Sequence, residues 1–269
     1  MNNSPIGVFD SGLGGLTCVK QLLQLAPQED IVYLGDTGRV PYGTRSTDTI
    51  IKYAMQDIEF LLSRGVKILI AACGTVSSTL PHSISDALPV PYLGVVESTA
   101  AAAVKATKTG RIGVIGTPAT IKSGSYLRAI DILLPSAVLV KNPCPLFVPL
   151  VESGYVQRDN PVTRMVAEEY LAPIKAAGVD TLIMGCTHYP IIKDIISDVM
   201  GPEVTLIDPG KEAAAAGMAL LKKLDMEALR DCSGARNYFV SDGIENFHQN
   251  AELFLGSLAG GSVDQIAID

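Results

Sequence analysis

Two cysteines stand in closely matched surroundings far apart in the chain. Cys73 follows the apolar run 67–72 and Cys186 follows the apolar run 180–185, and polar residues that suit the start of a helix come after each. Two thiols in equivalent contexts suggest two facing halves with one reactive sulfur each. This arrangement fits a proton exchange at carbon, because one thiolate can remove a proton from one face of the carbon and the opposite thiol can protonate the resulting planar intermediate on its other face.

Short β-rich runs alternate along the chain with longer stretches of helical periodicity. The expected strands cover 6–10, 31–35, 67–72, 92–96, 111–116, 136–141, 181–184, 204–207 and 238–241. The expected helices cover 14–26, 47–63, 163–176, 190–200 and 211–223. In the helix 47–63, for example, Ile50, Ala54, Ile58 and Leu61 recur at the spacing of one buried face. The alternation predicts an α/β fold with parallel sheets covered by helices.

The pattern restarts in the middle of the chain, where Ile112–Thr117 repeats the character of Ile6–Ser11. The repeat predicts two pseudo-symmetric α/β domains, the first formed by residues 1–97 plus 208–269 and the second by residues 98–207. Ligands of parallel sheets bind beyond the carboxyl ends of the strands. Because Asp10, Thr117 and both cysteine loops lie at such ends, the active site is expected in the cleft between the domains.

Composition excludes several classes of function. The 269 residues have a net charge of −7 and no run of Lys or Arg, which argues against nucleic-acid binding. No apolar stretch approaches the roughly 20 residues of a membrane span, and the first residues carry no basic n-region, so a cytoplasmic enzyme is expected. Five cysteines without a CxxC pair indicate reduced thiols and neither a disulfide framework nor a metal site.

Weaker motifs favour structural roles. Gly12-Leu13-Gly14-Gly15 with Asp36 hints at a dinucleotide site, but the third glycine of that fingerprint would fall on a helical Thr17, so a tight strand-to-helix turn is the better interpretation. The remaining cysteines (Cys18, Cys144 and Cys232) are expected to be structural, and His82 and His248 to lie on the surface. Asp10 and His188 stand beside the thiol loops, which favours functional roles for both.

Six motifs taken together resemble one family. They are Phe9–Leu16, Tyr33–Thr37, Pro41–Gly43, Ala72–Thr75, Ile112–Thr117 with Ile121–Ser123, and Gly185-Cys186-Thr187-His188-Tyr189-Pro190. In this order and spacing they resemble bacterial glutamate racemase, of the aspartate/glutamate racemase superfamily, over about residues 6 to 208. The related aspartate racemases usually carry a carboxylate where this chain has His188.

The resemblance implies interconversion of L- and D-glutamate without cofactor or metal, in a homodimer, with D-glutamate supplied for peptidoglycan. It implies catalytic roles for the two thiols and for two assisting groups: Cys73, Cys186, Asp10 and His188. It implies that glutamate is held by these residues: Asp10, Ser11, Pro41, Tyr42, Gly43, Gly74, Thr75, Thr117, Glu152, Thr187 and His188.

One position departs from the family's pattern. Gly74 stands where the family usually has asparagine, so two donors and one acceptor that would touch the substrate are missing. The residues leave three other functions open. They are a racemase for another amino acid such as aspartate, a thiol redox protein in which Cys73 and Cys186 form a reversible disulfide, and a two-domain binding protein for a small anion.

Overall fold

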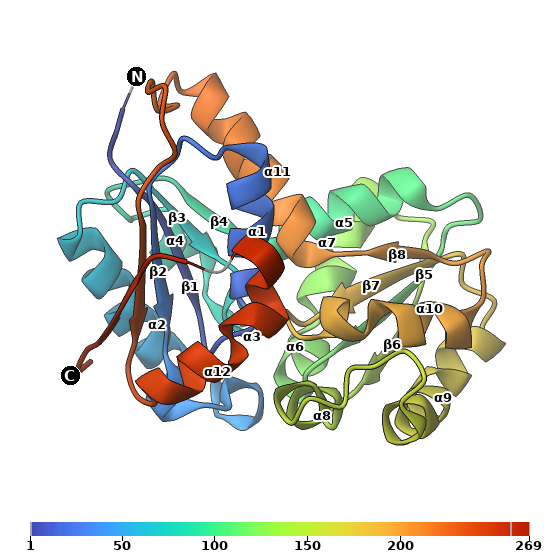
Figure 1. Cartoon of the computed structure of the whole chain (residues 1–269). Coiled ribbons are helices and arrows are strands. Elements are labelled where there is room, and N and C mark those ends of the chain that lie inside the picture. Colours follow the sequence, from blue (N-terminus) through green and yellow to red (C-terminus); the bar gives the residue numbers. More distant parts are fainter. Residues whose placement is uncertain (1, 259, 269) are drawn as a thin grey trace.

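The computed structural model describes residues 2–258 and 260–268, and within them two parallel sheets form two lobes that lie side by side (Figure 1). The first lobe contains six strands: β1 (Ile6–Asp10), β2 (Ile31–Gly35), β3 (Ile68–Ala71), β4 (Tyr92–Gly94), β9 (Arg236–Val240) and β10 (Ser262–Gln265). The second lobe contains four: β5 (Arg111–Gly116), β6 (Val138–Pro143), β7 (Thr181–Gly185) and β8 (Thr205–Ile207).

The two sheets share one strand order. The first runs β10-β9-β2-β1-β3-β4 and the second β6-β5-β7-β8, with parallel pairing throughout. The strands β2-β1-β3-β4 therefore correspond to β6-β5-β7-β8. Strands β3 and β7 hold equivalent places, and Cys73 and Cys186 lie directly beyond their carboxyl ends.

Helices cover the sheets. The longer ones are α1 (Leu16–Leu25), α2 (Thr47–Ser63), α5 (Val95–Ala106), α7 (Ser125–Leu133), α9 (Pro161–Ala176), α10 (Lys193–Met200), α11 (Pro209–Lys223) and α12 (Ile244–Leu255). Local sequence sets their ends: the Ser46 hydroxyl accepts from the Thr49 N–H at the start of α2, and Asn160 caps α9 with Pro161 in its first turn. Helix α11 packs against both α1 and α5 along the lobe boundary, and the hydrophobic core continues from one lobe into the other.

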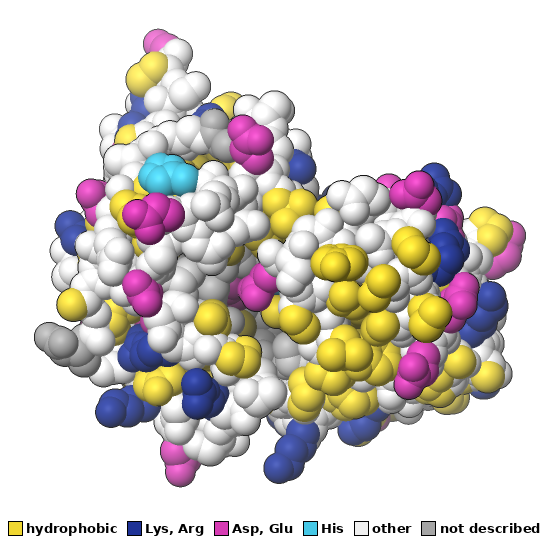
Figure 2. Space-filling view, turned by 60° about the horizontal axis from the view of Figure 1, so that its bottom comes forward, with side chains coloured by type: hydrophobic (Ala, Val, Ile, Leu, Met, Phe, Trp, Pro, Cys, Tyr) yellow, Lys and Arg dark blue, Asp and Glu magenta, His cyan; other side chains and the backbone are white. Residues whose placement is uncertain are grey.

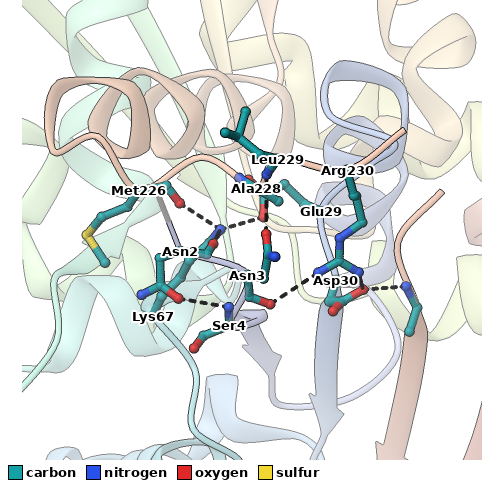
Figure 3. Close-up of polar contacts among 11 residues, drawn as sticks. Asn2, Asn3, Ser4, Glu29, Asp30, Lys67, Met226, Ala228, Leu229 and Arg230 are labelled. Carbon is teal, nitrogen blue, oxygen red and sulfur yellow. Dashed lines mark hydrogen bonds and ion pairs between the residues drawn. The ribbon is translucent and has the colours of Figure 1, made fainter. Parts of the chain in front are cut away.

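The chain returns to the first lobe after β8. A buried polar cluster binds the returning segment near residues 226–228 to the first lobe (Figure 3). The Lys67 ammonium donates to Glu29 at 2.6 Å and to the carbonyls of Asn2 at 2.7 Å and Met226 at 2.8 Å. The other Glu29 oxygen accepts from the Ala228 N–H at 2.8 Å. Strand β9 then pairs with β2, and β10 with β9.

The α/β fold class with parallel sheets is confirmed, whereas several element boundaries were wrong. Val95 and Val96 begin α5 instead of ending a strand, because the edge strand β4 stops at Gly94. The expected helix 190–200 is a short 3-10 turn followed by α10. The strand expected at 136–141 lies two residues later.

The C-terminal region also departs from expectation. The strand expected at 238–241 is not the last, since α12 and β10 follow it. Cys18 and Cys144 are buried, as suits structural cysteines, whereas Cys232, which was also expected to be structural, is exposed. The expected domain boundary at residues 97–98 falls inside α5 and stays a prediction. Among the described residues, no helix combines the length and the apolar character that a membrane crossing requires.

Candidate active site

A cavity of about 290 Å³ lies at the carboxyl ends of the strands, with walls from both lobes. In Figure 2 the same side of the molecule shows a furrow between the lobes, with hydrophobic side chains gathered on the second lobe. The cavity collects every residue expected at the site except Asp10. Those residues are Ser11, Pro41, Tyr42, Gly43, Cys73, Gly74, Thr75, Thr117, Glu152, Cys186, Thr187 and His188.

The first thiol sits between β3 and α3 (Gly74–Thr79). The Cys73 side chain is almost completely buried, and its Sγ lies 3.5 Å from the Ser11 Oγ. Burial, with the nearby charge of Asp10, raises the pKa of the Cys73 thiol to about 12. Cys73 is therefore a protonated thiol at neutral pH, which suits a proton donor.

Asp10 lies beneath the cavity floor, at the end of β1, and does not line the cavity. Its Oδ2 accepts from the Gly15 N–H at 3.0 Å, and its buried Oδ1 has no hydrogen-bond partner among the described residues. Burial raises the pKa of Asp10, and the charge of His188 and the Gly15 N–H oppose that rise only in part. Asp10 can thus exchange a proton with Cys73 from the side of the thiol that faces away from the cavity.

The second thiol has a basic neighbour where the first has an acidic one. The Cys186 Sγ lies 3.9 Å from Nδ1 of His188, whose Nε2 lies 3.0 Å from a Glu152 oxygen. Burial alone would lower the pKa of His188, but the hydrogen bonds to Cys186 and Glu152, and their charges, raise it to about 10. Both ring nitrogens face acceptors, and only the imidazolium donates from both.

The glycine-rich turn after β1 serves interlobe packing. A side chain on Gly14 would collide with Thr187 Oγ1 and with the His188 ring. Thr17, the second residue of α1, donates its hydroxyl to the Thr187 carbonyl at 3.3 Å. The loop of the other lobe fills this turn, which explains the glycine without a dinucleotide and holds the His188 loop against the start of α1.

Two buried carboxylates behind the cavity wall, those of Asp36 and Asp57, hold the loop Pro41–Gly43 in place. The Tyr42 hydroxyl donates to Asp36, and it also lies 3.2 Å from Asp57 Oδ2. Arg39 pairs with both carboxylates, at 2.6 Å to Asp36 and 3.0 Å to Asp57. Burial and these acids raise the pKa of Tyr42, so the phenol stays protonated. Its hydroxyl is thus occupied by the protein, which leaves other atoms of the loop to face a ligand.

Hydroxyl groups join the lobes at the cavity wall. The Thr75 Oγ1 lies 3.0 Å from the Thr117 Oγ1, which lies 3.1 Å from the Thr120 Oγ1. Gly43 lies so close to Thr117 that a side chain there would meet its Cβ at 2.8 Å. The wall is consequently a contact between the loop 41–43, helix α3 and the start of α6 (Pro118–Ser123).

Sequence reasoning missed eight residues that line the cavity. They are Gly12, Val40, Thr44, Pro118, Pro145, Val148, Pro149 and Gly185. The signal available was their position: seven of them follow β1, β2, β5 or β6 in the chain, and Gly185 is the last residue of β7. None of the described lining residues is Lys or Arg, so an anion would be held by N–H groups, hydroxyls and His188. The described residues also contain no cluster of three His, Cys, Asp or Glu side chains suited to a metal ion.

Two parallel α/β lobes with one thiol at the end of each equivalent strand define a class of two-thiol site built on opposite faces of one cleft. Residues 6–217 match the model of the Asp/Glu/hydantoin racemase family, and the chain belongs to that family. The resemblance to glutamate racemases drawn from the motifs is confirmed.

Known proteins resemble the chain over almost its whole length. A glutamate racemase of Syntrophus aciditrophicus is 46% identical over 257 residues, which cover 95% of this chain and 94% of that protein. The structure of glutamate racemase isoform RacE1 from Bacillus anthracis has a TM-score of 0.94 at 34% identity and covers 100% of this chain and 99% of its own. The glutamate racemase of Francisella tularensis in complex with D-glutamate has a TM-score of 0.91 at 37% identity, with 100% and 99% covered.

Proposed function

We propose that this chain interconverts L- and D-glutamate by proton exchange between Cys73 and Cys186, without a cofactor. The observation that carries the proposal is the placement of the two thiols, which enter one cavity from opposite lobes beyond equivalent strands. Inversion at an α-carbon needs a base on one face and an acid on the other. The relatives named above are glutamate racemases, one of them in complex with D-glutamate, which supports glutamate as the substrate.

The two thiols have different neighbours, which supports different roles for them in the proton exchange. The raised pKa of Cys73 keeps that sulfur protonated. We assign the thiolate of the exchange to Cys186, whose Sγ faces the His188 imidazole ring at 3.9 Å from Nδ1. The enantiomer whose α-hydrogen faces Cys186 then loses its proton to that thiolate, and the carbanion takes a proton from Cys73 on its opposite face. The products are the other enantiomer, a Cys186 thiol and a Cys73 thiolate.

The reverse reaction starts from that second state and retraces the same steps. Between turnovers in one direction, the proton on Cys186 must return to Cys73. Asp10, with its raised pKa and its unpartnered buried oxygen, is placed to pass a proton to Cys73, and His188 to take one from Cys186. Because these groups interact, a pH profile would report the group and not single residues.

The walls of the cavity support binding of a dicarboxylic amino acid. Ser11, Thr75, Thr117 and Thr187 supply hydroxyl groups, and the loop 41–43 and the helix starts at Gly74 and Pro118 supply backbone groups. Val148 and the neighbouring prolines Pro145 and Pro149 give the cavity an apolar wall. An α-carbanion gains from preorganised donors in a site that excludes water.

The test is incubation of D-glutamate in D₂O, with circular dichroism and α-proton NMR followed together and no cofactor or metal added. Loss of the dichroism with deuterium entering the α-position supports racemisation. Cys73→Ser and Cys186→Ser are each expected to abolish racemisation, by at least about 10³-fold, while exchange from one enantiomer persists. Cys232→Ser removes an exposed thiol and serves as the control.

Near-normal turnover in either serine variant at position 73 or 186 would overturn the two-thiol assignment. Aspartate is assayed beside glutamate, and faster turnover of aspartate would overturn the substrate. In a bacterial cell this reaction would supply D-glutamate for peptidoglycan in the cytoplasm, and a homodimer is the expected assembly. Sedimentation of the purified chain tests the assembly.

A further inference from the structure

The backbones of the two thiol-bearing segments meet at Gly74. A Cβ built on Gly74 would lie well inside 3.0 Å of the Gly185 carbonyl oxygen, a distance that real side chains do not adopt. Gly74 directly follows Cys73, and Gly185 directly precedes Cys186. The contact therefore joins the first lobe to the second between the two sulfur-bearing residues themselves.

The atom that blocks a side chain at this position is backbone, which makes the clash expensive. The Gly185 carbonyl belongs to the last residue of β7, and β7 is held on both sides, by β5 and by β8. Gly185 is itself closely packed against the neighbouring strand β5, since a side chain added there would bring its Cβ to 2.7 Å from the Ile115 carbonyl oxygen. Position 74 begins α3, whose side chains pack on the first lobe. A side chain at 74 must therefore push the lobes apart.

We propose that Gly74 is a positioning residue that lets the lobes close until the two backbones touch, and so sets the separation of Cys73 and Cys186. The asparagine implied at this position by the family's pattern would not fit here without opening the cleft. The absence of the asparagine side chain accordingly permits a tighter site, and it is more than the loss of a substrate contact. This inference rests on the proposed racemisation, and it adds the residue that tunes its geometry.

A second close approach on the other side of the thiols agrees with this reading. Thr187, which follows Cys186 as Gly74 follows Cys73, packs its hydroxyl against Gly14 of the first lobe. Each thiol loop is thus seated on a glycine or glycine backbone of the opposite lobe. Because residue 74 has no side chain, the first thiol loop contacts the second lobe there through backbone atoms alone.

The size of the effect follows from the geometry. To bring a new Cβ to 3.0 Å from the Gly185 oxygen, the segments must separate by roughly half an ångström or more. Misplacement of reacting groups by about 1 Å can cost on the order of 10²-fold in rate. Gly74→Ala and Gly74→Asn are therefore expected to lower kcat by about 10- to 100-fold, with a smaller change in KM.

The experiment measures kcat and KM for both glutamate enantiomers in the wild type and in Gly74→Ala and Gly74→Asn. Gly12→Ala is the matched control: it adds the same methyl to the rim of the same cavity but meets only the Val40 side chain, at 3.1 Å, so a smaller loss is expected. Thermal melting checks that each variant is folded.

Crystal structures of the wild type and of Gly74→Ala give a readout independent of turnover. The expected result is backbone contact between positions 74 and 185 in the wild type and a wider separation in the variant. Two results would overturn the inference: Gly74→Asn turning over glutamate as fast as or faster than the wild type, or an alanine that fits without moving Gly185. A wild type that does not racemise glutamate would refute the proposed function, and the crystal structures would still decide the role of Gly74.

Discussion

Replacing Glu152 by glutamine removes one of the two neighbouring charges, those of Cys186 and Glu152, that raise the pKa of His188. Glutamine keeps the size of the side chain and an oxygen that can accept from Nε2, but it removes the negative charge 3.0 Å from the ring. The imidazole is only 7% exposed and the Glu152 side chain 47% exposed. An opposite charge this close shifts a pKa by about 1 to 3 units, and the solvent around Glu152 places the effect at the lower end, about one unit.

The shift has a defined consequence for pH dependence. Because the pKa of His188 is raised to about 10, the imidazolium persists through neutral pH and is lost as the pH rises through that value. A fall of about one unit in Glu152→Gln would leave the imidazolium nearly intact at pH 7 but reduce its population about threefold at pH 9.5. The alkaline limb of kcat/KM moves to lower pH by the same amount if His188 dominates it.

The assay is a histidine-ring NMR titration of both proteins, with kcat/KM measured across the same pH range. The chain has only three histidines, which simplifies assignment. Glu97→Gln is the matched control, because it removes the same carboxylate from a surface contact with His82 at 3.7 Å and is expected to leave the His188 titration and the rate profile unchanged. Identical titration of His188 in Glu152→Gln and the wild type would refute the reasoning.

Two further predictions concern the buried polar clusters. Lys67→Met leaves the Glu29 carboxylate buried without its partner and is expected to lower the free energy of unfolding by about 3–5 kcal/mol, measured by urea denaturation. The double variant with Glu29→Gln should recover part of that loss, and strict additivity would contradict the ion-pair account. Tyr42→Phe removes the donor to Asp36 and Asp57 and should destabilise by about 1–3 kcal/mol. It should raise the KM for glutamate more than it lowers kcat, and an unchanged KM would show that the Tyr42 hydroxyl does not hold the loop in place.

The strands near the site could be predicted because their sequences are almost wholly apolar and end at small or polar residues. Ile6–Asp10, Ile31–Gly35 and Arg111–Gly116 have the predicted limits, and all three are central strands buried on both faces. The strand β10 could not be predicted in this way, because Ser262–Gln265 is a largely exposed edge strand whose polar residues give no period. Helix α12 carries an apolar face, with Phe247, Ala251 and Phe254, so the sequence does contain the signal for this element, which was not among the expected helices.

Within the site, the position of a residue in the sequence predicted the residues that line the cavity. It did not predict the buried contacts that lie behind the cavity wall. Any polar residue directly beyond a strand reaches the same edge of the sheet, which is why the expected residues converge. The depth of Asp10 and the engagement of the Tyr42 hydroxyl depend on packing between segments far apart in sequence. The contact between Gly74 and Gly185 depends on how closely two lobes approach, which no local pattern encodes.

The repeat in the sequence accounts for the symmetry of the site but not for its chemistry, which requires the two halves to differ. Equivalent strands β3 and β7 place one thiol on each face of the cavity. If their surroundings were identical, both sulfurs would favour the same protonation state, and neither enantiomer would meet a base and an acid together. The first half instead sets buried Asp10 behind Cys73, whose pKa rises, and the second sets His188 beside Cys186. The symmetry of the backbone thus places one sulfur on each face of the substrate. The different neighbours of the two sulfurs allow one to act as the acid and the other as the base, so that one proton can be exchanged between them.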